Sequence, residues 1–464
     1  MAQDEQKLLD AIQRNPEDDA PRLVYAEWLR NHDTGDGKLA ARGEFIRVQC
    51  ALADPNTDTT QRPRLEKREQ DLLEGHQDEW EQSLRTWVRQ VRRIDFKRGF
   101  IYGVTMRGDD FAEHDKQVFA AAPTIREACL VCFDDPRDDD PRDARAVAAS
   151  PYLENLTSLK LDGASNVQVL ALISSPHLAN LRSLDLSQDH SRSSNRIGAE
   201  GARALAWAMN LRQLTSLNLD GNKIGSLGLR ELVGSGLLAN LQSLSIRGNN
   251  IDAAGAMAIA SSPYLTRLES LNLSANKIGT AGMRPLAGAA CLAKLNSLDI
   301  AGNDIGAEGA RPLAESPYLT QLRSLNVNYN QLCNEGVQVL VGSPNLAQVT
   351  ALDLADNHIG DAGALAIGKS PYLTNLTKLT LRNNISRWNK IGNDGARALA
   401  FSPHLANLRS LDLGHNAIDA EGARTLAQSP YLTQLTCLDL GYSTSGYTTR
   451  YEGRKDLDAL RNGR

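Results

Sequence analysis

The chain has 464 residues, a formal net charge of −5, and hydrophobic and charged fractions of 41% and 23% that exclude a disordered protein. Aromatic residues make up only 5%, so the interior has to be filled mainly by Leu, Ala and Ile, which is typical of one small packing unit used many times. Residues 1–150 carry a net charge of −8 and residues 151–464 one of +3, and neither balance indicates a nucleic-acid-binding surface.

The first residues are acidic with no apolar run behind them, so we expect no signal peptide. No stretch approaches the roughly 20 apolar residues that span a bilayer, so we expect no membrane association. The six cysteines form no disulfide framework, which is typical of a reducing compartment and predicts a cytoplasmic protein. Cys129 and Cys132 form a CxxC pair without a second ligand pair, so we expect a buried strand rather than a metal or redox site.

The first predicted elements are four helices, because apolar residues recur at helical spacing over residues 5–14, 20–31, 43–53 and 63–89. They predict a small helical domain over residues 1–99.

Three short motifs in this region are PEDDAPRLVYAEWL at 16–29, GEFIRVQ at 43–49 and RGF at 98–100. Together they resemble the bacterial repeat-companion domain, a family that is fused to repeat arrays and whose activity is not established. The resemblance covers roughly residues 1–105. We expect Tyr25, Trp28 and Phe45 to lie in the core of this domain, and a binding role for them is the alternative.

The next elements look like incomplete repeats. Residues 100–106 and 125–133 are predicted strands on either side of a predicted helix at 110–122, and the acidic run 134–143 is a predicted loop. We therefore assign residues 100–150 to degenerate capping repeats, which would cover the apolar end of a repeat array.

Residues 151–440 repeat one pattern, L-x-x-L-x-L-x-x-N-x-I, in eleven copies. The copies follow at intervals of 25, 33, six times 27, 32 and 27 residues, which indicates a solenoid. Residues 441–464 are the expected C-terminal cap. The copies begin at Leu156, Leu181, Leu214, Leu241, Leu268, Leu295, Leu322, Val349, Leu376, Leu408 and Leu435.

Each copy predicts a strand, a turn, a helix and a second turn. The last two leucines are two residues apart, so they lie on one side of a short strand. The asparagine falls where the chain leaves the strand, and its amide can hydrogen-bond the turn backbone of neighbouring coils. A Gly-Ala-x-x-Leu-Ala segment then has helical spacing, and Ser-Pro-Tyr-Leu ends that helix because proline cannot continue its hydrogen bonding. Stacked copies predict an α/β solenoid with a parallel sheet inside and helices outside.

This pattern resembles the ribonuclease-inhibitor class of leucine-rich repeats, which includes the Ran GTPase-activating protein. The resemblance spans about residues 150–450 and implies a right-handed, curved horseshoe. Because that architecture serves many partners, the resemblance leaves the function open. It implies one alternative function, a regulator of a partner enzyme of the inhibitor or GTPase-activating type, although no activating residue maps onto this chain.

The sequence contains no GxGxxG with the following acid, no Walker loop, no HExxH and no GxSxG elbow. His358 and His415 fall on strand-to-loop turns two repeats apart, where surface polar residues are a simpler interpretation than a catalytic pair. We therefore expect no catalytic, cofactor-binding or metal-binding residues and no enzyme. A third hypothesis places an activity in residues 1–105, and a deep pocket there would favour it.

Small polar residues form columns along the exposed side of the predicted sheet, one almost all serine and the next rich in Asp and Asn. A solvated sheet is the simpler interpretation, and a shallow, acceptor-rich groove for a basic protein surface is the alternative. Asp412 and Asp439 are adjacent in this second column, so a cation or a partner Lys or Arg could relieve their repulsion. Such a ladder suits a macromolecule, and nothing in it builds a small-molecule pocket.

Two copies carry insertions, at residues 188–194 and around 385–388, and such insertions often map to a binding face. The second insertion contains Arg387 and Trp388, residue types that are enriched in binding hot spots. Tyrosines of an expected loop after the last strand lie on the same side, and Tyr329 replaces the usual small residue at a strand exit. The alternative is that Trp388 and the tyrosines only seal the loop and the cap.

We therefore predict a monomeric, non-enzymatic scaffold that binds another protein, and neither nucleic acid nor a membrane, through the concave sheet and the C-terminal rim loops. The predicted partner-binding residues are Tyr329, Arg382, Arg387, Trp388, Asp412, His415, Asp439, Tyr442 and Tyr447.

Overall fold

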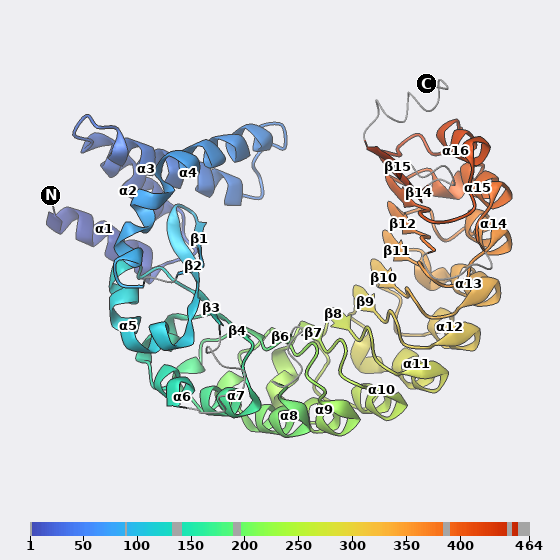
Figure 1. Ribbon diagram of the computed structural model, residues 1–464, viewed down its shortest axis with the longest axis horizontal. Coiled ribbons are helices and arrows are strands. Elements are labelled where there is room, and N and C mark those ends of the chain that lie inside the picture. Colours follow the sequence, from blue (N-terminus) through green and yellow to red (C-terminus); the bar gives the residue numbers. More distant parts are fainter. Residues whose placement is uncertain are drawn as a thin grey trace. The chain divides into compact units, whose positions relative to one another are not determined.

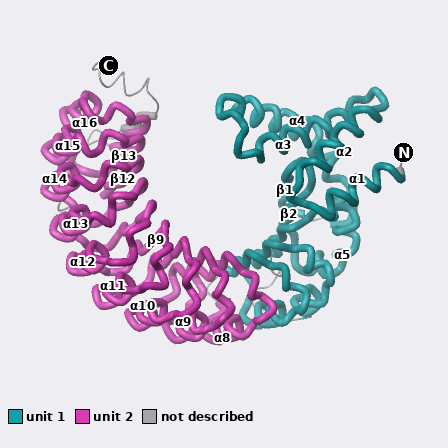
Figure 2. The backbone as a smooth tube through the Cα atoms, turned by 180° about the vertical axis from the view of Figure 1, so that it is seen from behind, with its two compact units in different colours: residues 1–186, 191–195 teal, residues 187–190, 196–464 magenta. Residues whose placement is uncertain are grey.

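The computed structural model describes residues 2–88, 91–131, 142–188, 196–383, 390–442 and 448–452. The chain divides into two compact units (Figure 2). Unit 1 comprises residues 1–186 and 191–195, and unit 2 comprises residues 187–190 and 196–464. The domain boundaries that the repeat pattern suggests, after residues 99, 150 and 440, stay predictions.

Unit 1 begins with four helices, as the sequence predicts (Figure 1). Tyr25 and Phe45 are buried, and Trp28 is partly buried against the same core as Tyr25, which confirms their expected place. The third helix starts before the predicted residue 43, and the fourth ends before the predicted residue 89. The helices are α1 (Ala2–Arg14), α2 (Ala20–Asn31), α3 (Lys38–Ala53) and α4 (Arg62–Arg85).

The rest of unit 1 alternates strands and helices, and two of its elements differ from the prediction. The sequence pattern missed the edge strand β1, whose charged residues and short length mask the alternation. It also placed a loop over residues 134–143, where a helix begins at Arg142. The elements are β1 (Arg93–Lys97), β2 (Phe100–Arg107), α5 (Gly108–Ala121), β3 (Glu127–Val131), α6 (Arg142–Ala148), β4 (Ser158–Asp162), α7 (Asn166–Ile173) and β5 (Ser183–Asp185).

The turn between β1 and β2 packs into the helices of unit 1. Gly99 has a φ of +83°, and a Cβ there would lie 2.3 Å from Ile46 Cγ1, so the close approach requires glycine. The Gly99 N–H donates to the side-chain oxygen of Gln49 on α3. Phe100, the next residue, lies in the same buried cluster as Tyr25 and Ile46. The strand pair β1–β2 therefore forms one hydrophobic core with the helices.

Unit 2 repeats one coil, in which a three-residue strand is followed by a helix, and the helices cover one side of the strands (Figure 1). From β6 to β14 the described strand pairs are parallel and in register. This arrangement confirms the predicted α/β solenoid. The strands are β6 (Ser216–Asn218), β7 (Ser243–Ser245), β8 (Ser270–Asn272), β9 (Ser297–Asp299), β10 (Ser324–Asn326), β11 (Ala351–Asp353), β12 (Lys378–Thr380), β13 (Ser410–Asp412), β14 (Cys437–Tyr442) and β15 (Thr448–Glu452). The helices are α8 (Gly198–Trp207), α9 (Gly225–Val233), α10 (Ala253–Ala260), α11 (Gly279–Ala287), α12 (Gly306–Ala314), α13 (Cys333–Val341), α14 (Asp361–Lys369), α15 (Asn393–Ala400) and α16 (Ala420–Ala427).

The last strand of unit 2 corrects the prediction of a C-terminal loop. β15 runs antiparallel to β14, with Tyr451 opposite Leu438, so Tyr451 belongs to a strand. Threonine, arginine and tyrosine in this segment favour an extended conformation, which turn-forming neighbours obscured. The sequence also predicts a short helix in this cap, over residues 456–460, which lie outside the described residues.

Buried asparagines connect the coils of unit 2, as the sequence predicts. Asn303 is completely buried, and its Nδ2 donates to Ile300 O of its own coil at 3.0 Å and to Leu273 O of the preceding coil at 2.9 Å. Its Oδ1 accepts from the N–H of Ile278. The same pattern recurs along unit 2, so each asparagine satisfies turn backbone that would otherwise lack partners. Its buried members are Asn222, Asn249, Asn276, Asn303, Asn330 and Asn357.

A second series of hydrogen bonds links the turns that follow the helices. Ser262 Oγ donates to Val233 O of the preceding coil at 2.6 Å and accepts from the N–H of Tyr264. Ser235 and Ser316 donate in the same way to Ala206 O and Ala287 O. The Ser-Pro turns therefore do more than end the helices, because their serines join each coil to the previous one.

Candidate protein-binding face

The strands of unit 2 present a polar face on the side away from the helices. In each strand from β6 to β13 the middle leucine is buried, and the residues on either side of it are only partly buried or exposed. Because the strands pair in register, equivalent residues of successive coils lie side by side. The serine column and the Asp/Asn column of the sequence are therefore real columns on this face.

A shallow groove of about 230 Å³ lies over strands β9 to β12. Its polar side chains contact one another across strands, since Asn326 Nδ2 donates to Asp299 Oδ2 at 3.0 Å. The groove thus presents carboxylate, amide and hydroxyl groups together. Its lining includes Ser297, Asp299, Ser324, Asn326, Ala351, Asp353, Lys378 and Thr380.

Asp353 is a groove carboxylate that is held partly out of water. Burial raises the pKa of its carboxyl above the ordinary value, and the negative charges of Asp412 and Asp299 add to the rise. The N–H of Ala355 and the charge of Lys378 act in the opposite direction without cancelling it. The ionised form of Asp353 would therefore gain from a positive group placed in the groove.

Three of the predicted site residues form one cluster beyond the groove. Arg382 follows β12 and reaches across two strands, so that its Nε lies 3.0 Å from Asp412 Oδ2 and its Nη2 2.9 Å from Asp439 Oδ2. The other oxygen of each aspartate accepts a backbone N–H, from Gly414 at 2.9 Å and from Gly441 at 2.8 Å. The sequence suggested a bound cation or a partner side chain to relieve the repulsion between these aspartates, and Arg382 of the same chain does so.

Two glycines leave the space that this arrangement needs. A Cβ at Gly414 would lie 3.1 Å from Arg382 Cζ, so the guanidinium passes directly over this residue. A Cβ at Gly441, whose φ is +69°, would lie 2.7 Å from the backbone nitrogen of His415. Gly414 and Gly441 occupy the same position as Arg382 in the next two coils, so both belong to the same arrangement as the ion pairs.

The cluster keeps a negative net charge, because it contains two aspartates and one arginine. Burial alone would lower the pKa of Arg382, but the hydrogen bond to Asp412 and the charges of Asp412, Asp439 and Asp356 raise it above its ordinary value. Arg382 thus stays charged at all ordinary pH values, and the cluster can still attract a cationic group of a partner.

Tyr329 and His415 occupy the same strand-exit position of their coils, directly before the asparagine. Their φ values are 56° and 61°, in the left-handed region that Gly248 and Gly302 adopt at this position of other coils. A residue with a side chain costs about 1 kcal/mol here. The Tyr329 side chain is 52% exposed. An exposed aromatic at a position that favours glycine is consistent with a contact role.

The remaining predicted contacts are only partly described. Arg387, Trp388 and Tyr447 lie outside the described residues, as does most of each insertion. Tyr442 is the last residue of β14 and pairs with Thr448 through the backbone, but its side chain is also outside the description. These four residues stay predictions.

The sequence interpretation gave a shallow, acceptor-rich groove as its alternative and emphasised the C-terminal rim, but it did not single out Asp353. A signal was present, since Lys378 interrupts the serine column one strand away from Asp353 in the acidic column. Only the register of strands β11 and β12 shows that Lys378 and Asp353 lie close together, so the structure was needed to interpret this signal.

In the described ranges, no group of three or more His, Cys, Asp or Glu side chains could hold a metal ion. None of the helices in these ranges is long and apolar enough to cross a membrane. His358 and His415 occupy strand-exit turns, as predicted, but His358 follows its coil asparagine whereas His415 precedes it.

The Leucine Rich repeat family matches nine segments of the chain, which coincide with the coils of unit 2. This chain is a leucine-rich repeat protein, a class whose members commonly mediate protein–protein interactions through the surface of the solenoid. The matched residues are 193–206, 210–233, 238–260, 264–287, 291–314, 318–341, 348–368, 387–400 and 404–427.

Several solved structures resemble the chain at low identity. An internalin of Listeria monocytogenes strain 4b F2365 is 22% identical with a TM-score of 0.34, over 71% of this chain and 93% of that one. A chain of the yeast Rad7 and Elc1 complex is 14% identical with a TM-score of 0.49, and the match covers 89% of this chain and 94% of that one. A chain of the mouse RP105/MD-1 complex is 16% identical with a TM-score of 0.39, and the match covers 68% of this chain and 55% of that one. No curated protein matches the chain. These likenesses carry no argument about function.

Proposed function

We propose that this chain is a non-enzymatic scaffold that binds a protein partner with a basic contact surface on the polar face of unit 2. The observation that carries the proposal is the groove over β9 to β12, in which burial and neighbouring acids raise the pKa of Asp353. A lysine or arginine of the partner would offset the unfavourable ionisation of Asp353. Charge complementarity of this kind speeds association and selects the partner.

The C-terminal part of the same face would extend the contact. The Arg382 cluster keeps a negative charge, and its guanidinium has donors beyond the two that hold the aspartates. Tyr329 supplies an exposed aromatic side chain near the groove. Arg387, Trp388, Tyr442 and Tyr447 are further proposed contacts at the rim, because aromatic and arginine side chains dominate binding energy at interfaces.

The test is quantitative affinity purification from the native cell with the full chain and two double variants. D299N/D353N removes the negative charge of the groove and keeps the size of the side chains. E308Q/E335Q is the matched control, because it removes two exposed acids from helices α12 and α13 on the opposite side of the strands. We expect a partner recovered with the wild-type chain and the control to be lost, or strongly reduced, with the groove variant.

The recovered partner is then titrated in purified form at several salt concentrations. The proposal predicts weaker binding at higher salt, because the contact is between opposite charges. Equal recovery with both double variants, or a contact that salt does not weaken, would overturn the proposed face.

We further propose that unit 2 belongs to the ribonuclease-inhibitor class, since most of its coils have 27 residues and an α-helix after each strand. We propose that residues 1–99 form a repeat-companion domain. Support comes from residues 98–100, one of the three motifs, which pack against α3 and the helical core. Regulation of a partner enzyme, the monomeric state and the cytoplasmic location stay predictions.

A further inference from the structure

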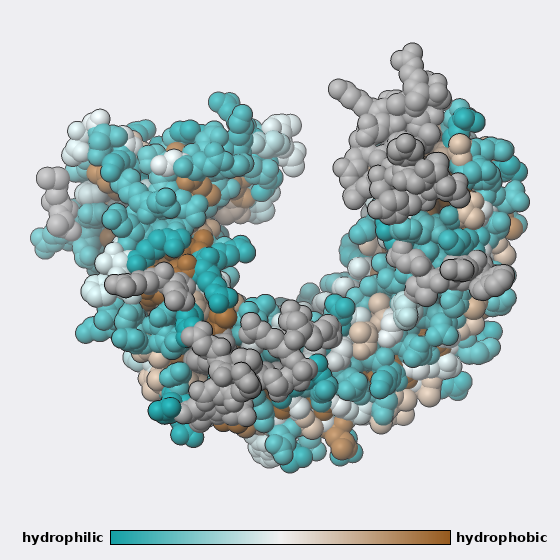
Figure 3. Space-filling model, in the orientation of Figure 1, coloured by the Kyte–Doolittle hydropathy of each residue, from teal (hydrophilic) through white to brown (hydrophobic). Residues whose placement is uncertain are grey.

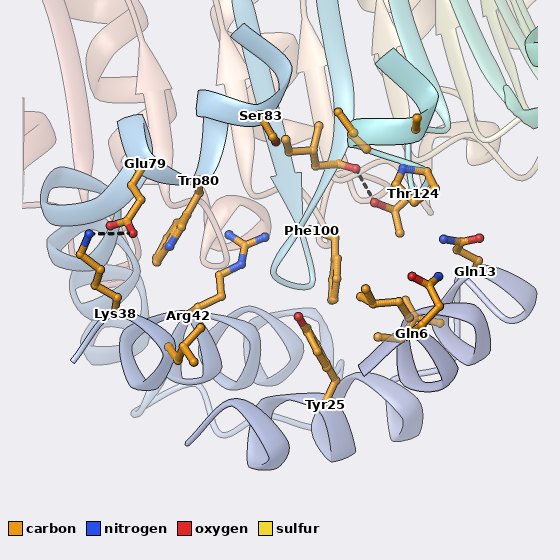
Figure 4. A pocket seen from close by; sticks show the side chains of 18 residues that line it. Gln6, Gln13, Tyr25, Lys38, Arg42, Glu79, Trp80, Ser83, Phe100 and Thr124 are labelled. Carbon is orange, nitrogen blue, oxygen red and sulfur yellow. Dashed lines mark hydrogen bonds and ion pairs between the residues drawn. The ribbon is translucent and has the colours of Figure 1, made fainter. Parts of the chain in front are cut away.

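Unit 1 contains a cavity that the sequence pattern does not indicate (Figure 4). Its volume is about 440 Å³, within the range of small-ligand sites. Helices α1 to α4, strand β2, the end of α5 and residues 122–124 after it supply its walls, which combine apolar and polar side chains. A pocket in this part of the chain is the feature that would favour an activity there beyond protein binding.

Arg42 on α3 brings a positive charge to this cavity. Figure 4 shows its guanidinium between the rings of Trp80 and Phe100, with Cζ 4.7 Å and 5.8 Å from their centroids. Phe45 and Phe96 lie within 5.7 Å of the same carbon. Contact with aromatic faces stabilises the cation only in part, because rings cannot accept as many hydrogen bonds as a guanidinium donates.

The guanidinium of Arg42 is not neutralised within the described residues. Its Nη1 is shielded from solvent without a hydrogen-bond partner, although the side chain as a whole is partly exposed to the cavity. Burial lowers the pKa of Arg42 to about 10, and the one group that opposes this is the Tyr25 phenol, which is neutral at ordinary pH because burial and Glu5 raise its own pKa. By contrast, the buried Arg22 has the carboxylates of Asp19 and Glu17 in its surroundings.

The other charges of the cavity compensate each other. Lys38 Nζ lies 3.1 Å from Glu79 Oε1, so this pair adds no net charge to the lining. Thr124 Oγ1 already donates to Ile101 O at 2.8 Å. The cavity therefore offers one positive charge beside apolar side chains.

We propose that this cavity binds a small organic monocarboxylate with an apolar body, whose carboxylate pairs with Arg42. One uncompensated positive charge matches a monoanion, whereas a phosphate dianion would need further cationic donors. The apolar body would pack against side chains such as Leu9, Ile12 and Phe100. The amides of Gln6 and Gln13, on the far side of the cavity from Arg42 in Figure 4, would contact its other end.

Isothermal titration calorimetry on the full chain tests this proposal with 3-phenylpropionate, indole-3-acetate and 4-methylvalerate. Each acid is compared with its neutral amide, which has nearly the same shape. We expect at least one acid to bind in the micromolar to low-millimolar range and its amide to bind about 10- to 100-fold more weakly, the effect of one charge-assisted contact. Quenching of Trp fluorescence should accompany binding, because Trp80 lines the cavity.

Two variants separate a binding role of Arg42 from a structural one. R42M should abolish acid binding and leave the Tm of the free protein equal or higher, since no ion pair is lost. R47Q on the same helix is the control, because Arg47 is absent from the cavity lining and lies 3.8 Å from Glu27. The proposal is overturned if none of the three acids binds, if amides bind equally well, or if R42M binds normally or lowers the Tm strongly.

Discussion

The two units of this protein handle an arginine in opposite ways. In unit 2, Arg382 lies within 3.0 Å of one carboxylate oxygen on each of two neighbouring strands. In unit 1, Arg42 lies over aromatic rings, and its Nη1 has no hydrogen-bond partner. In unit 2 each coil can supply partners for the polar groups of the next, whereas in the part of unit 1 before the first copy at Leu156 each contact is formed once. An unpaired cation such as Arg42 in unit 1 is therefore available to an external ligand.

The cores of the two units also differ, because one is built from repeated contacts and the other from single ones. Unit 2 is filled by leucines of successive coils and tied by the asparagine series. Unit 1 relies on aromatic contacts such as Phe45 with Trp80, whose centroids are 4.6 Å apart. A change in a repeated element of unit 2 should therefore disturb neighbouring coils, and a change in unit 1 should act at one junction.

The largest effect is expected from Asn303→Ala in unit 2. The variant removes hydrogen bonds to Leu273, Ile300 and Ile278 and leaves their buried backbone groups without partners. Because each unsatisfied buried group costs about 1–3 kcal/mol, we expect a loss of about 4 kcal/mol in the free energy of unfolding. Urea unfolding followed by circular dichroism measures it.

Asn407→Ala is the matched control for this experiment. Asn407 is exposed and makes one hydrogen bond to Thr374 O of a neighbouring coil. Its replacement should cost less than about 1 kcal/mol. Equal losses for the two variants would show that burial of the asparagine series contributes little.

The second prediction concerns the glycine at the junction in unit 1. Gly99→Ala places a Cβ 2.3 Å from Ile46 Cγ1 at a φ of +83°, so we expect a loss of about 3 kcal/mol. Gly302→Ala in unit 2 should cost only about 1 kcal/mol, because a Cβ there meets its neighbours at 3.7 Å and Ala275 occupies the equivalent position. Fluorescence of Trp28 and Trp80 monitors the first variant, and a milder effect of G99A than of G302A would contradict the comparison.

The contrast between the units explains how much could be predicted from the sequence. The coil of unit 2, its register and the bonding of asparagines such as Asn222 follow from one pattern seen eleven times. The position of Arg382, two residues after Thr380 of the Asp/Asn column, was also predictable, but its contact with Asp439 was not. That contact spans 57 residues, and the guanidinium reaches it by passing over Gly414, where a Cβ would lie 3.1 Å from Arg382 Cζ.

Before the first copy at Leu156, unit 1 has no repetition to average over. Helical spacing located the helices, and Tyr25 and Phe45 were correctly expected in the core. The cavity beside Arg42 arises from residues of five helices, a strand and a loop, which come together only in the folded structure. Arg42 itself looks like an ordinary surface arginine in the sequence, because neither charge nor spacing distinguishes it.

A third, smaller effect is expected from Arg382→Gln. Without the guanidinium, the carboxylates of Asp412 and Asp439 lose their shared partner, and we expect a loss of about 1–2 kcal/mol at low salt. Adding Asp412→Asn should recover part of it, since the remaining repulsion disappears. Thermal unfolding at low and high salt measures both effects. A double variant that is less stable than R382Q would contradict the role of Arg382 as a link between the aspartates.

The smallest effect is expected from Asp353→Asn, and its sign depends on pH. The pKa of Asp353 is raised in the folded chain, so the folded state holds the proton more tightly than the unfolded one. As pH rises from the unfolded value of about 3.9 through the folded value, the wild-type chain loses stability that the variant keeps. The Tm of D353N should therefore exceed that of the wild type at pH 7 and match it at acid pH. The corresponding gain in the free energy of unfolding at pH 7 is within about 1 kcal/mol. Asp394→Asn on the exposed helix α15 controls for the amide substitution. A lower Tm of D353N at pH 7 would mean that Asp353 gains more from Lys378 than it loses to burial. The carboxylate would then already have its partner within the groove, as Asp412 has in Arg382.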